Sequence, residues 1–293
     1  MNDLSQRIGL IGVGLMGQGI ALSLQRHGRA LTLLEHAGNQ PLDELVAAGA
    51  QTAAQPREVA AACGVVILCV TGSPQVRSVM QGPQGLLAGL RPGTVVIDCS
   101  TSIPADTRVI AAEVHAAGGR FIDAPMTRTV QHAREGRLNL LVGGDAAVLA
   151  EVEPVLRCFA ENIAHAGSVG AGHEMKLLHN FVSLGSAVLL AEAAACAARS
   201  GVDARVLVDV LGKGGGAGVA LERMKPFLLD GDASSLPFYL ANAAKDLGYY
   251  VQMASDAGAV SAMAQAALDD VARGVARAGG QVFMPELAAL LRE

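Results

Sequence analysis

The chain has 293 residues, the length of about two domains of roughly 150 residues each. Hydrophobic residues make up 51% and charged residues 17% of the chain, which excludes a disordered protein. The net charge of −5 and the aromatic content of 3% disfavour nucleic acid as a partner, because its binding needs a basic face and often stacking rings.

Two further classes of protein are disfavoured by local features. The most apolar stretch, residues 177–198, is interrupted by His179, Asn180, Ser183 and Glu192, so we predict a buried helix and no membrane contact. The five cysteines are scattered and form no Cys-x-x-Cys pair. This spacing predicts reduced thiols in a cytoplasmic protein and no metal site.

The first half of the chain alternates short apolar runs with alanine-rich helical stretches. Runs that are apolar throughout are typical of strands buried on both faces. With helices between them, such strands predict an α/β fold with a doubly wound, parallel sheet. The predicted strands are residues 8–11, 31–34, 65–70, 95–98, 121–123 and 138–142.

The second half of the chain is predicted to be helical. After about residue 167 the apolar runs stop, and helical segments follow at residues 174–199, 204–211, 218–229, 242–257 and 261–278. We therefore predict an α/β domain over residues 1–167 and an all-α domain over residues 168–293, joined by a long interdomain helix. The all-α domain is expected to bind substrate and to mediate dimerisation.

A glycine-rich motif follows the first predicted strand and opens a predicted helix. The pattern is G-x-G-x-x-G, which in this context is typical of the Rossmann dinucleotide-binding domain. Its first glycine permits a tight turn, the second lets pyrophosphate approach the backbone, and the third lets helix and strand pack closely. The predicted cofactor-binding residues of this motif are Gly12, Val13, Gly14, Leu15, Met16 and Gly17.

The second predicted strand ends at Glu35, about 20 residues beyond the glycine motif, where a carboxylate can accept hydrogen bonds from the ribose hydroxyls. The same carboxylate repels a 2′-phosphate, and no arginine follows it directly. The sequence therefore predicts NAD as the cofactor. A glycine-rich turn followed by a solvated glutamate is the structural alternative.

One polar stripe runs along the apolar helix predicted after residue 173. Lys176, His179, Asn180 and Ser183 have the i, i+3, i+4, i+7 spacing of one helix face. Such a stripe on a buried helix is expected to face a cavity, a ligand or a polar partner, and a lysine partly removed from water is suited to proton transfer. A buried network between domains would give the same spacing.

A loop at the carboxyl edge of the predicted sheet follows Asp123-Ala124-Pro125. Open α/β sheets bind ligands at this edge. Arg128 in the loop is a candidate clamp for an anion, because a guanidinium pairs with two oxygens of a carboxylate, phosphate or sulfonate. A solvated surface charge is the alternative for this residue.

Taken in order along the chain, these motifs resemble those of the β-hydroxyacid dehydrogenase family, which includes 3-hydroxyisobutyrate dehydrogenase and tartronate semialdehyde reductase. The resemblance covers nearly the whole chain. Its motifs are Ile11-Gly-Val-Gly-Leu-Met-Gly17, Asp98-Cys-Ser-Thr101 with Pro104, Asp123-Ala-Pro125, Gly136 to Gly143-Gly144, Lys176 with Asn180, Glu192-Ala193 and Lys245-Asp246-Leu247.

The resemblance implies roles for individual residues. Lys176 matches the catalytic lysine and Asn180 its partner one turn later. Thr101 matches a threonine beside the nicotinamide ribose, and Lys245 matches a lysine that reaches the site from the helical domain. Both are therefore cofactor-binding candidates. Two further cofactor-binding candidates lie in the loop that borders the adenosine half, and these are Thr71 and Ser73.

The loop after Asp-Ala-Pro departs from the common family pattern of Ser followed by two glycines. Thr127, Arg128 and Thr129 stand there instead, which is similar to the sulfolactaldehyde reductase branch, where the arginine binds a sulfonate. Ser183 also matches that branch, whereas His179 stands where the branch has Asn. The predicted substrate-binding residues are Thr127, Arg128, Thr129, His179 and Ser183.

These features predict an NAD-dependent oxidoreductase that moves hydride between nicotinamide and a small anionic β-hydroxyacid or semialdehyde, with Lys176 as general acid and base. A sulfolactaldehyde-type or other strongly anionic substrate is favoured. Alternatives are 3-hydroxyisobutyrate dehydrogenase, tartronate semialdehyde reductase, an imine reductase, or a non-catalytic dinucleotide-binding protein. We expect a homodimer or homotetramer.

Overall fold

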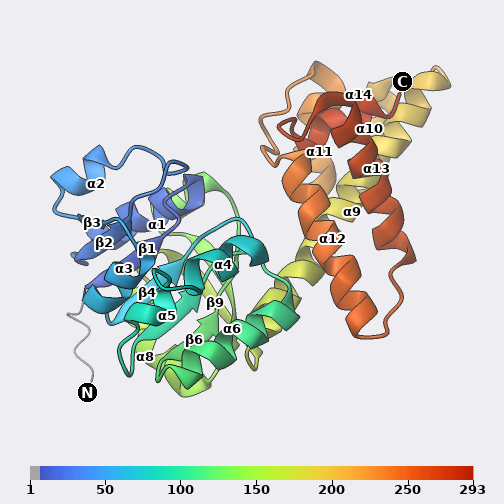
Figure 1. Cartoon of the computed structure of the whole chain (residues 1–293). Helices are drawn as coiled ribbons and strands as arrows, with labels where there is room; N and C mark the ends of the chain where they lie inside the picture. Colours follow the sequence, from blue (N-terminus) through green and yellow to red (C-terminus); the bar gives the residue numbers. More distant parts are fainter. Residues whose placement is uncertain (1–6, 293) are drawn as a thin grey trace. The chain divides into compact units, whose positions relative to one another are not determined.

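The computed structural model describes residues 7–292. The chain forms two compact units, one ending at Lys176 and the other beginning at Leu177. Figure 1 shows a sheet covered by helices in the first unit and helices alone in the second. The predicted order of an α/β unit followed by a helical unit is therefore confirmed, whereas the domain boundary at residue 167 stays a prediction.

The first unit is built on one sheet with strand order β3-β2-β1-β4-β5-β6-β8-β7, and β9 pairs with β8. At its centre β1 lies parallel to both neighbours, with Ile8 opposite Leu31 on one side and Val65 on the other. The strands are β1 (Ile8–Ile11), β2 (Leu31–Leu34), β3 (Gln51–Ala53), β4 (Val65–Leu68), β5 (Val95–Asp98), β6 (Arg120–Asp123), β7 (Met126–Thr127), β8 (Leu138–Gly144) and β9 (Ala160–Gly167).

Alternate residues of the central strands pack into two cores, one on each face of the sheet. Ile67 of β4 belongs to the core that contains α1 and α8, whereas Leu68 belongs to the core that contains α3, α4 and α6. Burial on both faces explains why these strands are apolar throughout. The helices of this unit are α1 (Leu15–Arg26), α2 (Asp43–Ala47), α3 (Pro56–Ala62), α4 (Ser73–Met80), α5 (Leu86–Gly89), α6 (Pro104–Ala116), α7 (Val130–Glu135) and α8 (Ala146–Leu156).

The sheet departs from the prediction in two respects. It is not parallel throughout, because β8 runs antiparallel to β6 and to β7. Three strands were not predicted, namely β3, β7 and β9. Of these, β3 and β9 each pair with one neighbour and carry exposed polar residues such as Gln51 and Glu161, so they lack the apolar run of a central strand.

The second unit has its own core, formed by residues of α9, α12 and α13 such as Val188, Leu247 and Val271. The four helices after α9 lie within two residues of their predicted bounds. The helices are α9 (Ala171–Arg199), which crosses from the first unit into the second, α10 (Ala204–Gly212), α11 (Val219–Asp230), α12 (Leu240–Asp256), α13 (Ala262–Ala278), the short 3₁₀ helix η1 (Met284–Glu286) and α14 (Leu287–Leu290).

The predicted burial of α9 is wrong over part of its surface. Leu177 and Leu184 are buried, but Leu178 is 43% and Val182 66% exposed. Among the described residues α9 alone is long and apolar enough to cross a membrane, and 28% of its most apolar window is buried. This length and composition do not distinguish a membrane-spanning helix from the core helix of a soluble protein, which has the same features.

Candidate active site

The glycine motif forms a tight turn between β1 and α1. Gly12 has φ +94°, a conformation that favours glycine, and a Cβ at this residue would lie 2.3 Å from the carbonyl oxygen of Cys69. A Cβ on Gly17 would lie 2.0 Å from the carbonyl oxygen of Gly12, which explains why helix and turn require glycine at both positions. The predicted turn and close packing are present.

The same turn is shaped to receive a phosphate. A Cβ on Gly14 would meet nothing within 4 Å, so the space beside this backbone is open. Gly14 caps α1 without a side-chain hydrogen bond, and Leu15 and Met16 follow in the first helical turn, where amide donors lack helical partners. The amide of Val13 is different, because it donates to Asn39 Oδ1 at 3.2 Å. The residues present therefore fit a dinucleotide.

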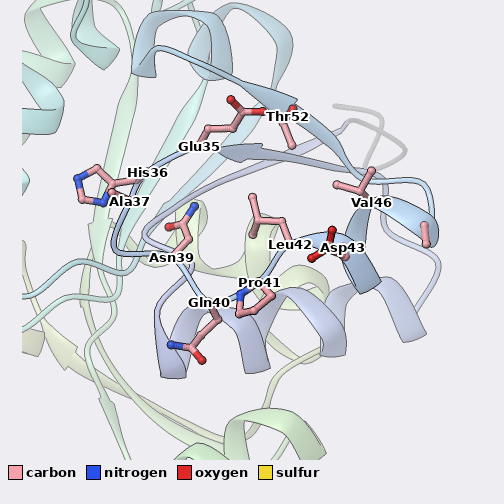
Figure 2. Close-up of a pocket in the computed structure, with 11 residues that line it drawn as sticks. Glu35, His36, Ala37, Asn39, Gln40, Pro41, Leu42, Asp43, Val46 and Thr52 are labelled. Atoms are coloured by element: carbon pink, nitrogen blue, oxygen red, sulfur yellow. The ribbon is translucent and has the colours of Figure 1, made fainter.

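Glu35 lines an open pocket of about 1010 Å³ beyond the end of β2. In Figure 2 its side chain lies beside Thr52, with Leu42 and Asp43 on the α2 side of the pocket. Two carboxylates, those of Glu35 and Asp43, thus line one pocket. The negative charge of these carboxylates would repel the 2′-phosphate that NADP carries on its adenosine ribose.

We expect kcat/KM with NADH to exceed kcat/KM with NADPH by a factor of about ten or more. A repulsion of about 1.4 kcal/mol between the pocket carboxylates and the 2′-phosphate corresponds to a factor of ten. Glu35→Ala should narrow the difference, and steady-state kinetics with both cofactors measures it. Glu44→Ala is a matched control, because Glu44 is exposed but is absent from the pocket lining. Equal or better use of NADPH by the unmodified enzyme would contradict the expectation.

The remaining cofactor candidates of the first unit lie where β4 leads into α4 and where β5 leads into α6. Ser73 is the first residue of α4 and is 5% exposed, and its Oγ accepts the amide of Ile103 at 2.8 Å. Its hydroxyl thus connects the start of α4 with the start of α6. Thr71 is exposed and Thr101 is half-buried. Of these three residues, only Ser73 has a side-chain hydrogen bond with an evident structural role, and all three remain predictions as cofactor ligands.

The predicted substrate loop is held by polar contacts across β7, β8 and β9. Thr127 Oγ1 accepts from Asn139 Nδ2 at 3.1 Å, and Thr129 Oγ1 lies 2.7 Å from His132 Nδ1. Arg128 forms an ion pair with Glu161 on β9, and its guanidinium also donates to the carbonyl of Arg137. The candidate anion clamp is therefore already paired, and the arginine lowers the pKa of Glu161.

The backbone of Arg128 has φ +82°, the only positive value at a non-glycine position among residues 7–292. Left-handed backbone costs a non-glycine residue about 1–2 kcal/mol. Arg128 thus has a backbone conformation that favours glycine, the residue that the resemblance described above places here.

In the second unit the polar stripe of α9 continues into a buried cluster. Asn180 is 6% exposed and donates from Nδ2 to Asp246 Oδ2 on α12 at 2.6 Å. His179 is exposed, and its Nδ1 lies 3.0 Å from Asn180 Oδ1. Ser183, one turn later, is half-buried. The cluster fixes the amide of Asn180 with a carboxylate that is itself 4% exposed.

Lys245 balances the charge of that carboxylate. Its Nζ forms an ion pair with Asp246 Oδ1 at 2.7 Å and lies 5.0 Å from the centre of the Tyr249 ring. Asp246 was not predicted as a site residue, although it adjoins Lys245 in the Lys-Asp-Leu motif. The sequence did offer a signal for Asp246, because it is an acidic residue on the otherwise apolar buried face of α12.

Asp246→Asn should lower kcat by about tenfold or more, because hydrogen bonds to charged groups contribute about 1.5–3 kcal/mol. The variant keeps the side-chain size but removes the charge that holds Asn180 and Lys245. Asp209→Asn is the matched control, since Asp209 pairs with Lys213 on the exposed surface. A change in kcat below about twofold would show that Asp246 only packs the helices.

Family models match both halves of the chain. Residues 7–167 match the NAD-binding domain of 6-phosphogluconate dehydrogenase, and residues 170–290 match the NAD-binding model of NADP-dependent 3-hydroxyisobutyrate dehydrogenase. The 2-(hydroxymethyl)glutarate dehydrogenase of Eubacterium barkeri is 32% identical over 250 residues, which are 84% of this chain and 81% of that protein. The chain belongs to the β-hydroxyacid dehydrogenase family.

Two more proteins are similar over most of their lengths. The NAD-dependent L-serine dehydrogenase of Pseudomonas aeruginosa is 33% identical over 92% of this chain and 89% of its own. The structure of Mycobacterium tuberculosis 3-hydroxyisobutyrate dehydrogenase with L-serine has a TM-score of 0.88 and 27% identity, and covers 99% of this chain and 100% of its own. These findings confirm the predicted family, the dehydrogenase class and an NAD(P) cofactor for this β-hydroxyacid dehydrogenase.

Proposed function

We propose that this β-hydroxyacid dehydrogenase oxidises a small anionic β-hydroxyacid, or reduces its semialdehyde, with NAD and with Lys176 as general acid and base. The observation that carries the proposal is the fixed amide of Asn180. It lies one helical turn beyond Lys176 and is held by a buried carboxylate, an arrangement suited to orienting a reacting group.

NAD, when bound, supplies or accepts the hydride. In reduction the ammonium of Lys176 donates a proton to the carbonyl oxygen of the substrate, and in oxidation the neutral amine accepts the hydroxyl proton. Asn180 orients Lys176 or holds the reacting oxygen. The main contribution of the chain is positioning, because the hydride chemistry belongs to the cofactor.

The substrate is proposed to carry a second or a tetrahedral anionic group, such as another carboxylate or a sulfonate. The similar Eubacterium barkeri enzyme is named for 2-(hydroxymethyl)glutarate, which has two carboxylates. Arg128 is suited to such a group if it exchanges Glu161 for the substrate. The Arg128–Glu161 pair is partly open to water, where the attraction between opposite charges is weak, so Arg128 loses little on leaving Glu161. A loop-holding role for Arg128 favours 3-hydroxyisobutyrate or tartronate semialdehyde as the alternative.

The deciding experiment is NADH oxidation, followed at the nicotinamide absorbance, with a panel of semialdehydes and with a cyclic imine as the competing substrate class. Turnover of a semialdehyde that is lost in Lys176→Ala supports the proposal. Binding of NADH without turnover of any substrate supports a non-catalytic dinucleotide-binding protein, and turnover of the imine alone supports an imine reductase.

We propose a homodimer or homotetramer in the cytoplasm. Exposed apolar side chains along α9, such as Leu178 and Val182, are of the kind that association buries, and light scattering determines the oligomer size. The described cysteines are all free, in accord with a reducing compartment.

A further inference from the structure

A fully buried histidine lies in the first turn of α9, three residues before Lys176. His173 has no exposed surface, and both of its ring nitrogens have partners. Its Nε2 lies 3.1 Å from the carbonyl oxygen of Ser100, and its Nδ1 lies 2.8 Å from Thr107 Oγ1 on α6. Because a carbonyl only accepts, Nε2 carries a proton and donates it to Ser100.

The carbonyl that His173 holds belongs to the loop after β5. Ser100 immediately precedes Thr101, the residue predicted beside the nicotinamide ribose. The other side of this loop is fixed by Asp98, whose Oδ1 accepts the amide of Ser100 at 2.9 Å. The backbone N–H and the backbone carbonyl of Ser100 are thus both bound by buried side chains.

A second buried carboxylate fixes the start of α9. Asp123 has no exposed surface, and its two oxygens accept the amides of Gly170 and His173, each at 2.8 Å. The ring of His173 lies 3.7 Å from Asp123 Oδ2 and 3.9 Å from Asp98 Oδ2. Burial raises the pKa of Asp123, while His173 and the two amides oppose this shift.

The hydrogen-bond network around His173 does more than occupy space in the core. Buried polar groups cost free energy unless each is satisfied, and an apolar side chain of similar size would fill the same space without that requirement. His173 connects the loop carrying Thr101 with the helical turn carrying Lys176, and every partner lies in the unit that ends at Lys176. The two segments therefore have one common anchor.

We propose that His173 is a positioning residue that sets the place of Thr101 relative to Lys176, and thereby the place of the nicotinamide relative to the general acid. The role of Lys176 in this proposal rests on the proposed function, and that of Thr101 on the family resemblance. The physical link from His173 to the two segments does not, because it consists of the hydrogen bonds described above.

The kinetic test compares His173→Leu with His173→Gln, which retains a side-chain N–H donor. His173→Leu should lower kcat by about 10- to 100-fold, the effect of a misplacement of about 1 Å, and change the Kd for NADH less than about threefold. The isotope effect with 4-deuterated NADH should rise as hydride transfer becomes slower, and His173→Gln should recover part of kcat. Thr107→Val removes the contact at Nδ1 and is expected to lower kcat by about three- to tenfold.

A matched control separates positioning from loss of stability. Ser23 is also fully buried and donates to a carbonyl, that of Cys158 at 3.0 Å, but it lies on α1 away from both segments. Ser23→Ala should lower the Tm without changing kcat or the isotope effect. If His173→Leu does not fold, Thr107→Val takes its place in the same comparison. Equal kcat in the His173 or Thr107 variant and in Ser23→Ala, at matched folded fraction, overturns the proposal.

Hydrogen–deuterium exchange supplies a readout that needs no activity. In His173→Leu, or in Thr107→Val, the amides of residues 99–103 and 171–176 should exchange faster together, whereas in Ser23→Ala neither segment should change. Unchanged exchange, or a change in only one segment, overturns the proposal. A wild-type enzyme inactive on every β-hydroxyacid would contradict the proposed function, while this measurement would still decide the role of His173 as the common anchor.

Discussion

Replacing Lys176 with alanine is expected to lower kcat by about 10²- to 10⁴-fold, the usual contribution of a general acid or base. The reason is that no proton can then be delivered to the reacting oxygen from this helix turn. The Kd for NADH, measured by fluorescence titration, should change little, because the pyrophosphate and adenosine contacts are predicted at the glycine motif and Glu35.

Lys213→Ala is the matched control for this variant, since Lys213 is an exposed lysine that follows α10 and pairs with Asp209. The Lys213→Ala variant should retain full activity. Near-normal turnover of Lys176→Ala would contradict the assignment of the general acid and indicate that the polar stripe of α9 is structural.

Arg128→Ala is expected to lower kcat/KM for strongly anionic substrates. The corresponding loss of transition-state binding free energy should be about 1.5–3 kcal/mol, the range for hydrogen bonds to charged groups. Sulfolactaldehyde, tartronate semialdehyde and methylmalonate semialdehyde, assayed side by side, give the comparison. We expect the substrate with a sulfonate or additional anionic group to be preferred and to lose most. An equal loss for all three substrates, with the methyl-bearing one preferred, would mean that Arg128 only holds the loop.

Glu161→Gln distinguishes the two roles of Arg128, because it removes the ion pair and leaves the arginine in place. If Arg128 binds the substrate, the released guanidinium should keep or raise kcat/KM for the anionic substrates. If Arg128 holds the loop through Glu161, the variant should reproduce the loss seen in Arg128→Ala.

The central strands and the glycine turn were predictable from sequence because their causes are local. A strand buried on both faces must be apolar throughout, as β4 is, and the turn at Gly12 excludes any Cβ. The edge strand β9 and the direction of β8 were not predictable in this way. Strand direction is decided by pairing with neighbours, and an edge strand such as β9 carries Glu161 and His165 on exposed positions.

The candidate site was predictable where residues lie close in sequence, as Lys176 and Asn180 do on one helix. Contacts between distant residues were not. Asp246 meets Asn180 because α12 packs on α9, and the Phe181–Tyr250 ring contact shows how closely these helices approach. The pairing of Arg128 with Glu161 depends likewise on β9, a strand that the sequence pattern did not reveal.

The left-handed backbone of Arg128 bears on how substrate choice can change during evolution. Each arginine codon differs from one glycine codon by a single base, so one nucleotide exchange can interconvert the two residues. The loop path at φ +82° already suits glycine, and the exchange would leave the chain trace intact while adding or removing one full charge. If Arg128 binds the anion as proposed, one mutational step at position 128 would change the class of anion that the enzyme accepts.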